Sequence, residues 1–476
     1  MTDIGIILTP VVGIIFKTAF YVFFGYFIIL MLYYIILAII GAIEEKRRTL
    51  ESKEENYSIL ASSSFALPVS VIIPAHNEEE WITDSLNSVL KQTYPGIEVI
   101  IVNDGSTDNT MAILGRMLDL EPIDMAYTHK FKDGGTTGFS RSRLHPNVTV
   151  ISKTAGYKKA GAVNTGLNLA KYKYICVIDA DTVLEPDALM KVMAEIQKDP
   201  DHIIGVGSYF GLVNGFKISG GAIIERSFSY SPIIAYQNLE YIRSLIGNRV
   251  AWSKFNAMPN VAGGFGLWRR DIVANMGGYD KTSCGEDMEY TFRAHDYMAK
   301  NKSKGYRVLM LPYFAGWTEG PERVKKLLIQ RNRWQRALEE TIRKYRHMIF
   351  NPKYGGMAFF VIPYQILYEI FGVFFEVMSL ILVLLGLALG NIDFKLFAMI
   401  FLFMLLIQGI VSLLSIFAVL RGQKFLKPRY VAYLALLGFV EMFWYHWILM
   451  FAKIMGTRAY ARGIRDYDRY EREKRT

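Results

Sequence analysis

Two aspartates directly follow an apolar, strand-forming run, and their spacing suits the binding of a metal ion or a phosphate. Tyr174–Ile178 predicts a buried strand, and Asp179 and Asp181 come after it. Open α/β sheets bind ligands at the carboxyl ends of their strands, and side chains two residues apart point the same way while the backbone stays extended. Two such carboxylates can hold a hard divalent cation, which in turn holds phosphates. An isolated Asp-x-Asp is more often a solvated strand end, so the remaining motifs decide between these interpretations.

Three more polar positions are predicted at the same edge of the sheet. Asp104 follows the apolar run Ile97–Val102, and Glu78 lies in the turn after Val69–Ile73. Asp104 beside a glycine is an ordinary turn residue. In a nucleotide site, its carboxylate would accept a hydrogen bond from a nucleobase N–H, assisted by Glu78. Lys159 begins a predicted helix, where its charge opposes the helix dipole unless a phosphate lies nearby, and a solvated lysine explains that position equally well.

Two segments in the second half of the chain carry further candidates. The glycine-rich stretch Val261–Gly266 is a bulge or tight turn, or a place where a sugar ring approaches the backbone closely. Asp287, which follows Gly285 and Glu286, lies in the first turn of a predicted helix. There it is either an acid favoured by the helix dipole or a general base that takes a proton from an incoming hydroxyl.

A third segment combines an amide, a cation and an indole. The helix predicted from about Pro321 to Lys344 places Gln330, Arg333 and Trp334 on one face. Contact with anionic lipid headgroups explains the basic residues of such a helix. A Gln, an Arg and a Trp clustered on one face better suit a diphosphate and a stacked sugar.

Apolar residues are concentrated at the two ends of the 476-residue chain, which is 52% hydrophobic and has a net charge of +10. Thr18–Ile43 lacks charged residues and exceeds the roughly 20 residues that a transmembrane helix needs, and Lys46–Arg48 place its end in the cytoplasm. Phe371–Leu389 and Leu396–Leu420 predict a hairpin of two further spans. Val431–Met455 contains three ionisable residues and is expected to be interfacial or re-entrant. The sequence therefore predicts a multi-pass cell-membrane protein with a cytoplasmic middle domain.

Alternating strand and helix patterns between the apolar ends predict an α/β domain with a parallel sheet covered on both faces. Glu44–Ser64 is expected to be a polar linker, and Asp119–Asn147 a flexible excursion. Only two cysteines occur, Cys176 and Cys284, so neither a disulfide framework nor a metal-binding knuckle is predicted.

Taken in order, these motifs resemble those of membrane-embedded, processive family 2 glycosyltransferases, the family of the cellulose, hyaluronan, chitin and poly-N-acetylglucosamine synthases. The resemblance extends over about Val69 to Leu338 and rests on Asp104, Asp179-Ala180-Asp181, Gly285-Glu286-Asp287 and Gln330-Arg331-Asn332-Arg333-Trp334. It implies an α/β GT-A fold, Rossmann-like with a mostly parallel sheet, flanked by transmembrane helices. It also implies an inverting transfer, dependent on Mg²⁺ or Mn²⁺, from a UDP-sugar to the end of a growing β-linked polysaccharide that is exported across the membrane.

The resemblance also implies a role for each candidate residue. Asp287 would be the catalytic base, and Asp181 with Asp179 would hold the metal. The substrate-binding residues would be Glu78 and Asp104 at the uracil, Lys159 and Asp179 at the diphosphate, Gln330, Arg333 and Trp334 at the diphosphate and acceptor end, Gly263, Gly264 and Phe265 at the acceptor pocket, and Glu286 next to Asp287.

The predicted domains are an N-terminal transmembrane region (1–48), a cytoplasmic GT-A domain (49–320), amphipathic interface helices (321–356), a C-terminal transmembrane region (357–456) and a basic cytoplasmic tail (457–476). Expected partners are a UDP-sugar, a glycan acceptor and membrane lipids, without nucleic acid, and the oligomeric state is left open. Two other functions are compatible with the sequence. One is a single transfer of sugar to a polyprenyl phosphate, and the other is a membrane transporter or receptor that senses nucleotide without catalysis.

Overall fold

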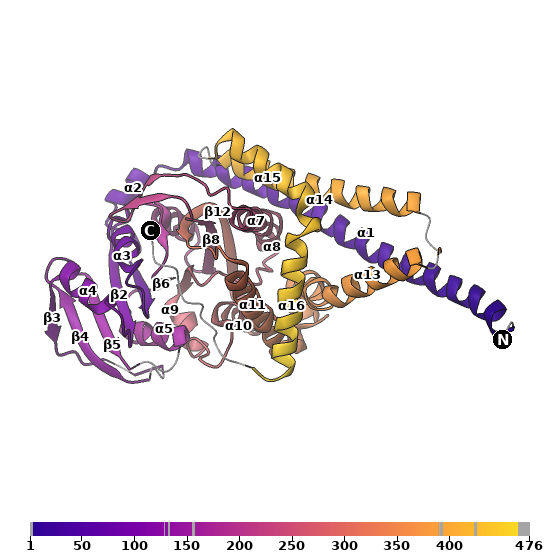
Figure 1. Ribbon diagram of the computed structural model, residues 1–476. Coiled ribbons are helices and arrows are strands. Elements are labelled where there is room, and N and C mark those ends of the chain that lie inside the picture. Colours follow the sequence, from indigo (N-terminus) through magenta and orange to yellow (C-terminus); the bar gives the residue numbers. More distant parts are fainter. Residues whose placement is uncertain are drawn as a thin grey trace.

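A large β-sheet forms the middle of the molecule, and long helices from both ends of the chain extend from one side of it (Figure 1). The computed structural model describes residues 3–127, 129–131, 134–154, 158–388, 390, 394–422 and 426–464. Within these residues the sheet has ten strands, in the order β3-β4-β5-β2-β1-β6-β11-β8-β12-β7.

Four neighbouring parallel strands form the centre of this sheet. In spatial order they are β5 (Val148–Lys153), β2 (Ile97–Asp104), β1 (Val69–Ala75) and β6 (Tyr174–Ile178). Their near-continuous apolar sequences are almost completely buried, as expected for a parallel sheet covered by helices. Because they run the same way, their carboxyl ends meet at one edge, where Glu78, Asp104 and Asp179 lie. The helices that follow β1, β2, β5 and β7 are α3 (Ile82–Leu90), α4 (Thr110–Leu118), α5 (Lys158–Leu169) and α6 (Ala188–Lys198).

Antiparallel strands extend the sheet on both sides, so the complete sheet is mixed. β11 (Phe265–Arg269) runs antiparallel between β6 and β8 (Ile203–Leu212). β12 (Arg307–Thr318) pairs parallel with β8, and β7 (Val183–Leu184) pairs antiparallel with β12. Because β11 lies beside β6, the glycine-rich stretch that precedes β11 lies next to the end of β6. A separate hairpin consists of β9 (Lys217–Ser219) and β10 (Ala222–Glu225).

The expectation of a flexible excursion over Asp119–Asn147 is wrong, because part of this segment forms the edge of the sheet. β3 (Leu120–Ile123) and β4 (Thr136–Ser142) pair with each other, and β4 pairs with β5, all antiparallel. Most of their side chains are exposed or half-buried. The segment therefore lacks the apolar alternation from which strands are predicted. Residues 128, 132 and 133 lie outside the described part of the chain.

The expected linker Glu44–Ser64 is also mostly helical. α1 (Asp3–Glu54) is one helix of 52 residues that continues through the charged sequence after the apolar run. Ion pairs one turn apart stabilise this end, with Arg47 nitrogens 2.5 Å from carboxylate oxygens of Glu44 and Glu51. A short helix, α2 (Tyr57–Ser62), then leads to β1.

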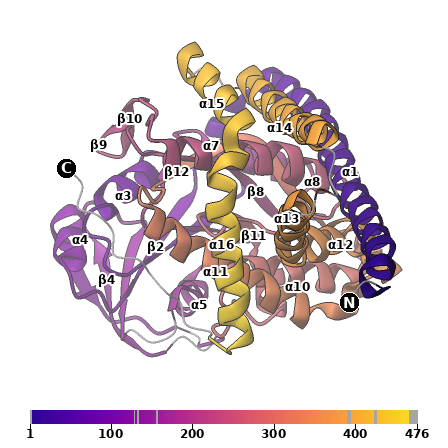
Figure 2. The same cartoon turned by 45° about the vertical axis from the view of Figure 1, so that its right-hand side comes forward.

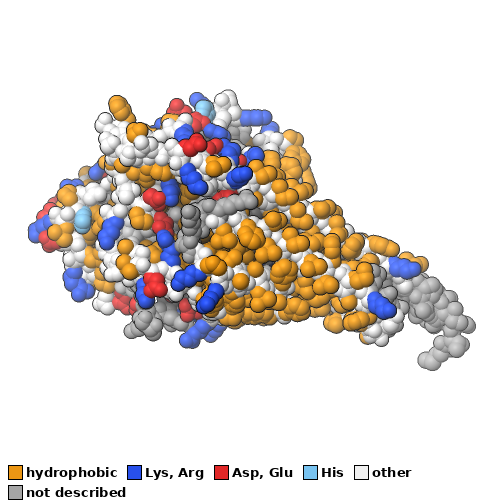
Figure 3. Space-filling view, turned by 90° about the horizontal axis from the view of Figure 1, so that it is seen from above, with side chains coloured by type: hydrophobic (Ala, Val, Ile, Leu, Met, Phe, Trp, Pro, Cys, Tyr) orange, Lys and Arg blue, Asp and Glu red, His pale blue; other side chains and the backbone are white. Residues whose placement is uncertain are grey.

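Two helical segments of the described chain are long and apolar enough to cross a membrane, Lys17–Glu54 in α1 and Phe397–Leu420 in α14 (Phe394–Gly422). Seen from above, hydrophobic side chains cover most of the helical extension, whereas charged side chains gather over the sheet domain (Figure 3). This segregation supports the prediction of membrane segments at both ends of the chain.

Two pairs of C-terminal helices are bent where the sequence predicts membrane segments. α13 (Gly372–Ala388) follows Met357–Ile370 at a bend of 42°. Within the last apolar run, Pro428–Phe443 and α16 (Tyr445–Ala461) meet at 56°. If each bent pair is one span, the described residues contain up to four, so the number of crossings stays a prediction. Of the predicted basic tail, residues 465–476 lie outside the described part.

α16 lies along α11 (Val324–Lys344), the helix that carries Gln330 to Trp334 (Figure 2). The two helices approach closely at Gly456, where a Cβ atom would lie 2.6 Å from the Cβ atom of Gln335 and 2.8 Å from the backbone oxygen of Asn332. Protein therefore covers one side of α16, and the expectation of an interfacial or re-entrant segment stays a prediction.

Gly211 in β8 is required by the packing of Trp317, so its replacement by alanine is expected to destabilise the fold. An alanine Cβ would lie 2.0 Å from the Cζ3 atom of the Trp317 ring, which is buried. Overpacking of this kind costs about 1–3 kcal/mol. At Gly115 in α4, no described atom outside the backbone of the helix and the neighbouring residues lies within 4 Å of such a Cβ, so Gly115→Ala should keep or raise stability. Thermal unfolding in detergent measures both variants, and equal unfolding temperatures would contradict this expectation.

Candidate active site

Lys159, in the first turn of α5, joins three segments that are far apart in the sequence. Its Nζ lies 2.5 Å from Oδ1 of Asp179 and 3.4 Å from Oε1 of Glu286. It also donates a hydrogen bond of 3.1 Å to the backbone oxygen of Gly263. The Lys159 side chain is only 11% exposed, which excludes a solvated lysine. Three other candidate residues, Asp179, Glu286 and Gly263, are thus brought together around the ammonium group of Lys159.

Asp287 lies at the start of α10 (Glu286–Lys300), next to the glycine-rich stretch. Its Oδ2 accepts hydrogen bonds from the backbone N–H of Gly263 at 3.1 Å and from Nδ2 of Asn260 at 3.4 Å. Its Oδ1 accepts the backbone N–H of Met288 at 2.8 Å. These contacts fix the orientation of a half-buried carboxylate, which can still be reached by a substrate hydroxyl.

The glycines at positions 263 and 264 let two acidic segments approach one loop. At Gly263, a Cβ atom would lie 2.7 Å from Nζ of Lys159 and 3.6 Å from Oδ2 of Asp287. At Gly264, a Cβ atom would lie 3.6 Å from Oδ2 of Asp179. The carboxylates of Asp179 and Asp287 therefore lie against adjacent residues of the same loop. A side chain at position 263 would displace the lysine that holds this arrangement together.

The turn after β6 holds the two aspartates that are expected to bind a metal. Asp179 and Asp181 are both half-buried, and the hydroxyl of Thr182 lies 3.5 Å from Oδ1 of Asp181. Burial raises the pKa of Asp179, and the charge of Asp181 adds to this rise, whereas Lys159 opposes it. A cation bound at the pair would favour the ionised form of both carboxylates.

The donor atoms in this turn fit a metal ion whose coordination is completed by substrate phosphates. Among the described residues, no group of three or more His, Cys, Asp or Glu side chains could hold a metal ion without other ligands. Mg²⁺ is usually held by one or two carboxylates together with the phosphates of a substrate. Asp179 and Asp181 are two carboxylates in one turn, and the ammonium of Lys159 lies 2.5 Å from Oδ1 of Asp179.

The loops after β1 and β2 contact each other at the same edge of the sheet. A ring nitrogen of His76 lies 2.7 Å from the backbone oxygen of Asp104, and Glu78 is half-buried beside this turn. Oδ1 of Asp104 lies 2.6 Å from Nζ of Lys153, whose side chain is fully buried at the end of β5. Lys153 is not among the predicted residues, because a charge at the end of a strand does not reveal which distant side chain it pairs with.

The face of α11 that carries Gln330, Arg333 and Trp334 packs on the start of α10. A Cβ atom at Gly285 would lie 2.5 Å from the Cβ atom of Ala337, which is one helical turn beyond Trp334. Trp334 is 40% exposed and Arg333 is half-buried. Oε1 of Gln330 is buried, and no described residue donates a hydrogen bond to it. The motif is therefore placed beside the first turn of α10, with the indole open to solvent.

Phe265 does not line the site, which corrects one prediction. Its side chain is completely buried in the core, with its ring centroid 6.4 Å from that of Phe210. Phe210 in turn lies 3.4 Å from the Cβ position of Gly264. Successive side chains of a strand point to opposite faces, and the register of β11 directs Phe265 into the core. Phe265 thus supports the glycine loop through Phe210 instead of contacting a sugar.

Two family models match the chain. "Glycosyl transferase family 2" matches residues 70–273, and "Glycosyl transferase family group 2" matches residues 174–452, more than half of the chain. The chain therefore belongs to glycosyl transferase family 2. The predicted family and the α/β GT-A architecture are confirmed, with parallel strands at the centre of a mixed sheet.

Similar proteins include the poly-beta-1,6-N-acetyl-D-glucosamine synthase of Staphylococcus epidermidis, 27% identical over 296 residues, which are 62% of this chain and 60% of that protein. The probable glycosyltransferase YdaM of Bacillus subtilis is 28% identical over 306 residues, 64% of this chain and 63% of that protein. The chain thus matches less than two thirds of the length of these relatives. The solved mannosyltransferase PcManGT from Pyrobaculum calidifontis, in complex with GDP-Man and Mn²⁺, is 17% identical with a TM-score of 0.48, over 91% of this chain and 99% of that one.

Replacing Lys159 by methionine is expected to leave Asp179 and Glu286 without their shared cation. Breaking a fully buried ion pair costs roughly 3–5 kcal/mol. The Asp179 side chain is 35% exposed, so we expect a smaller loss, about 1–3 kcal/mol of unfolding free energy. Adding Asp179→Asn should restore part of this loss, because it removes one uncompensated charge. Denaturant unfolding of the wild type, both single variants and the double variant measures the coupling.

An exposed ion pair provides the control for this cycle. Lys217→Met separates Lys217 from Glu225 on the β9–β10 hairpin and should leave the unfolding temperature almost unchanged. If Lys159→Met and Asp179→Asn have additive effects, without coupling, the two side chains do not interact as described.

Proposed function

We propose that this protein transfers sugar units from a UDP-sugar to the end of a growing β-linked polysaccharide, with inversion at the anomeric carbon. The observation that carries the proposal is one cluster: Lys159 contacts Asp179 and Glu286, while Asp287 accepts a hydrogen bond from Gly263, to which Lys159 also donates. Membership of glycosyl transferase family 2 supports sugar transfer. A similar protein named as a polysaccharide synthase supports a polymeric product.

The donor would bind across the carboxyl edge of the parallel strands. Asp104 and Glu78 would contact the uracil, and Lys159 would bind the diphosphate together with backbone N–H groups of the first turn of α5. Asp181, with Asp179, would hold Mg²⁺ or Mn²⁺. A divalent ion bound there neutralises negative charge on the leaving diphosphate.

Asp287 would act as the general base. The N–H groups of Gly263 and Met288 hold its carboxylate in place. As the acceptor hydroxyl oxygen attacks the anomeric carbon, its proton would pass to Asp287. The bond from that carbon to the diphosphate breaks on the opposite side, so the configuration inverts and no covalent sugar–enzyme intermediate is needed. Lys159 would stabilise the charge that develops on the diphosphate.

The acceptor end of the polymer would lie at Trp334. This indole is 40% exposed beside α10, and Gln330 and Arg333 on the same face would contact the diphosphate and the terminal sugar. Gly263 and Gly264 would leave space for a sugar ring against the backbone. A terminal sugar stacked on the indole remains bound between additions, which favours repeated transfer over a single transfer to a polyprenyl phosphate.

The catalytic domain would face the cytoplasm, and the polymer would leave through the membrane helices. The basic sequence Lys46–Arg48, directly after the apolar part of α1, supports this orientation. Two described helical segments are apolar enough to span a bilayer, and up to four if the bent pairs are counted. Trp444 and Trp447, at the start of α16, are candidate sugar contacts along the exit path.

Incubation of the purified protein in lipid nanodiscs with single UDP-sugars tests this proposal. We expect polymer from one UDP-sugar with Mg²⁺ or Mn²⁺ and none after chelation of divalent cations. Asp287→Asn should lower transfer by about 10²–10⁴-fold, because the general base is lost. Size analysis and digestion with linkage-specific hydrolases identify the product.

Asp201→Asn is the matched control, because the Asp201 side chain is 84% exposed, and it should retain full transfer. A product with one sugar per lipid would replace polymer synthesis by a single transfer. Wild-type transfer by Asp287→Asn would overturn the assignment of the base.

A further inference from the structure

One carboxylate oxygen joins three helices next to Arg331 of the Gln330–Trp334 motif. Glu240 lies near the end of α7 (Pro232–Ile242). Its Oε2 accepts a hydrogen bond of 2.9 Å from Nη2 of Arg331 in α11 and another of 3.0 Å from the hydroxyl of Tyr445 in α16. Arg331 and Tyr445 are buried. Glu240 therefore fixes the relative positions of α7, α11 and α16 at one point.

The guanidinium of Arg331 depends on this single carboxylate. Arg331 is 6% exposed, and its buried Nε and Nη1 atoms have no hydrogen-bond partner among the described residues. A buried cation with so few partners is costly unless its remaining contacts are favourable. The nearer of its two aromatic contacts is the indole of Trp334, whose ring centroid lies 4.1 Å from the Arg331 Cζ atom, and the ring centroid of Tyr241 lies 6.0 Å from the same atom. Removal of the Glu240 charge would leave Arg331 without its only ionic partner among the described contacts.

Trp334 is positioned by this chain of contacts. Arg331 stacks on the indole, while 40% of Trp334 remains exposed. A guanidinium on one side of an indole restricts the rotation of the ring and leaves the exposed part for a ligand with a flat, apolar face, such as a sugar ring.

We propose that Glu240 is a positioning residue for the acceptor: through Arg331 it holds Trp334 in the orientation that retains the terminal sugar, and through Tyr445 it ties that orientation to α16. This inference rests on the proposed function, because it concerns the acceptor side of the same site. It adds a residue from α7 that lies outside every motif identified in the sequence.

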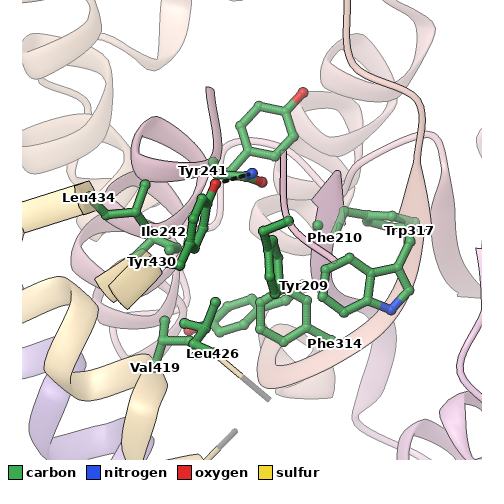
Figure 4. A pocket seen from close by; sticks show the side chains of 13 residues that line it. Tyr209, Phe210, Tyr241, Ile242, Phe314, Trp317, Val419, Leu426, Tyr430 and Leu434 are labelled. Carbon is green, nitrogen blue, oxygen red and sulfur yellow. Dashed lines mark hydrogen bonds between the residues drawn. The ribbon is translucent and has the colours of Figure 1, made fainter. Parts of the chain in front are cut away.

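α7 is itself fastened to the surrounding helices, so it can serve as a fixed support. Nε2 of Gln237 donates to the backbone oxygen of Pro321, just before α11, at 2.8 Å. Nδ2 of Asn238 donates to the hydroxyl of Tyr430 in α15 (Pro428–Val440) at 3.0 Å, beside an aromatic cavity between the sheet and the C-terminal helices (Figure 4). Glu240 therefore lies on a helix that is fixed both to the segment before α11 and to α15.

α16 connects this support to the apolar helices. His446 Nε2 lies 2.9 Å from Oε2 of Glu376 in α13, and Lys453 Nζ lies 2.7 Å from Oε2 of Glu369. Ionisable side chains in apolar surroundings are normally paired in this way. A displacement of α16 would therefore shift Glu240 and, through Arg331, the Trp334 indole, which we call the acceptor platform.

Glu240→Gln and Tyr445→Phe test the proposal in the 476-residue chain in nanodiscs. The acceptor probe is a set of short oligosaccharides obtained by partial hydrolysis of the wild-type product. For Glu240→Gln we expect KM for the oligosaccharide to rise about fivefold, as for the loss of a contact worth about 1 kcal/mol. The mean product length should also fall. KM for the UDP-sugar and its hydrolysis in the absence of acceptor should stay close to wild type.

A double variant separates positioning from general support of the fold. In Trp334→Ala protein, Glu240→Gln should add no further change in acceptor KM, because the platform is already absent. Glu225→Gln on the exposed hairpin is the control and should match wild type. If Glu240→Gln does not fold, Tyr445→Phe removes one hydrogen bond to the same oxygen and should change acceptor KM in the same direction by a smaller factor.

The outcomes distinguish this inference from the proposed function. If the wild-type protein makes no polymer, the proposed function itself is contradicted, and the variants need not be compared. With an active wild type, an unchanged acceptor KM in both Glu240→Gln and Tyr445→Phe would overturn the positioning role. An equal loss for donor and acceptor, or an undiminished effect of Glu240→Gln in Trp334→Ala protein, would do the same.

Discussion

The site depends on the ion pairs between a lysine, Lys159, and the carboxylates of Asp179 and Glu286 at the end of a parallel strand. Lys159 is nearly buried, and its charge is compensated by Asp179, Glu286 and the backbone oxygen of Gly263. Such compensation is needed because a buried charge without partners is strongly unfavourable. It requires the end of β6, the loop before β11 and the start of α10 to converge. An incoming diphosphate could take over part of this compensation, which links the stability of the empty site to donor binding.

The same rule of paired charges connects the sheet domain to the apolar helices. Nη2 of Arg243, in the helical segment after α7, lies 2.6 Å from Oε2 of Glu441. Lys453 of α16 forms an ion pair with Glu369. Together with the Glu240 contacts, these pairs hold α7 and α11 against the C-terminal helices. These pairs therefore connect α7 and α11 mechanically to the C-terminal helices.

The strand ends that carry Asp104 and Asp179 could be predicted because continuous apolar runs identify buried parallel strands, and parallel strands bring their ends together. Contacts between side chains that are far apart in the sequence could not be predicted. Lys153 and Glu240 lack any local signal of their roles, since each is defined by a side chain from a distant element. The side of the sheet that Phe265 faces depends on the register of β11, which a glycine-rich sequence does not reveal.

Calorimetric titration of the protein with UDP, with and without Mn²⁺, tests most directly whether the Asp179–Lys159 cluster is the donor site. If the aspartate pair and the diphosphate bind the same metal ion, the metal should make UDP binding at least about tenfold tighter, because the diphosphate gains a contact with the cation. We predict that Asp181→Asn abolishes this enhancement, whereas Asp201→Asn keeps it. An enhancement of the same size in Asp181→Asn would contradict the account, because the metal and the diphosphate would then bind elsewhere.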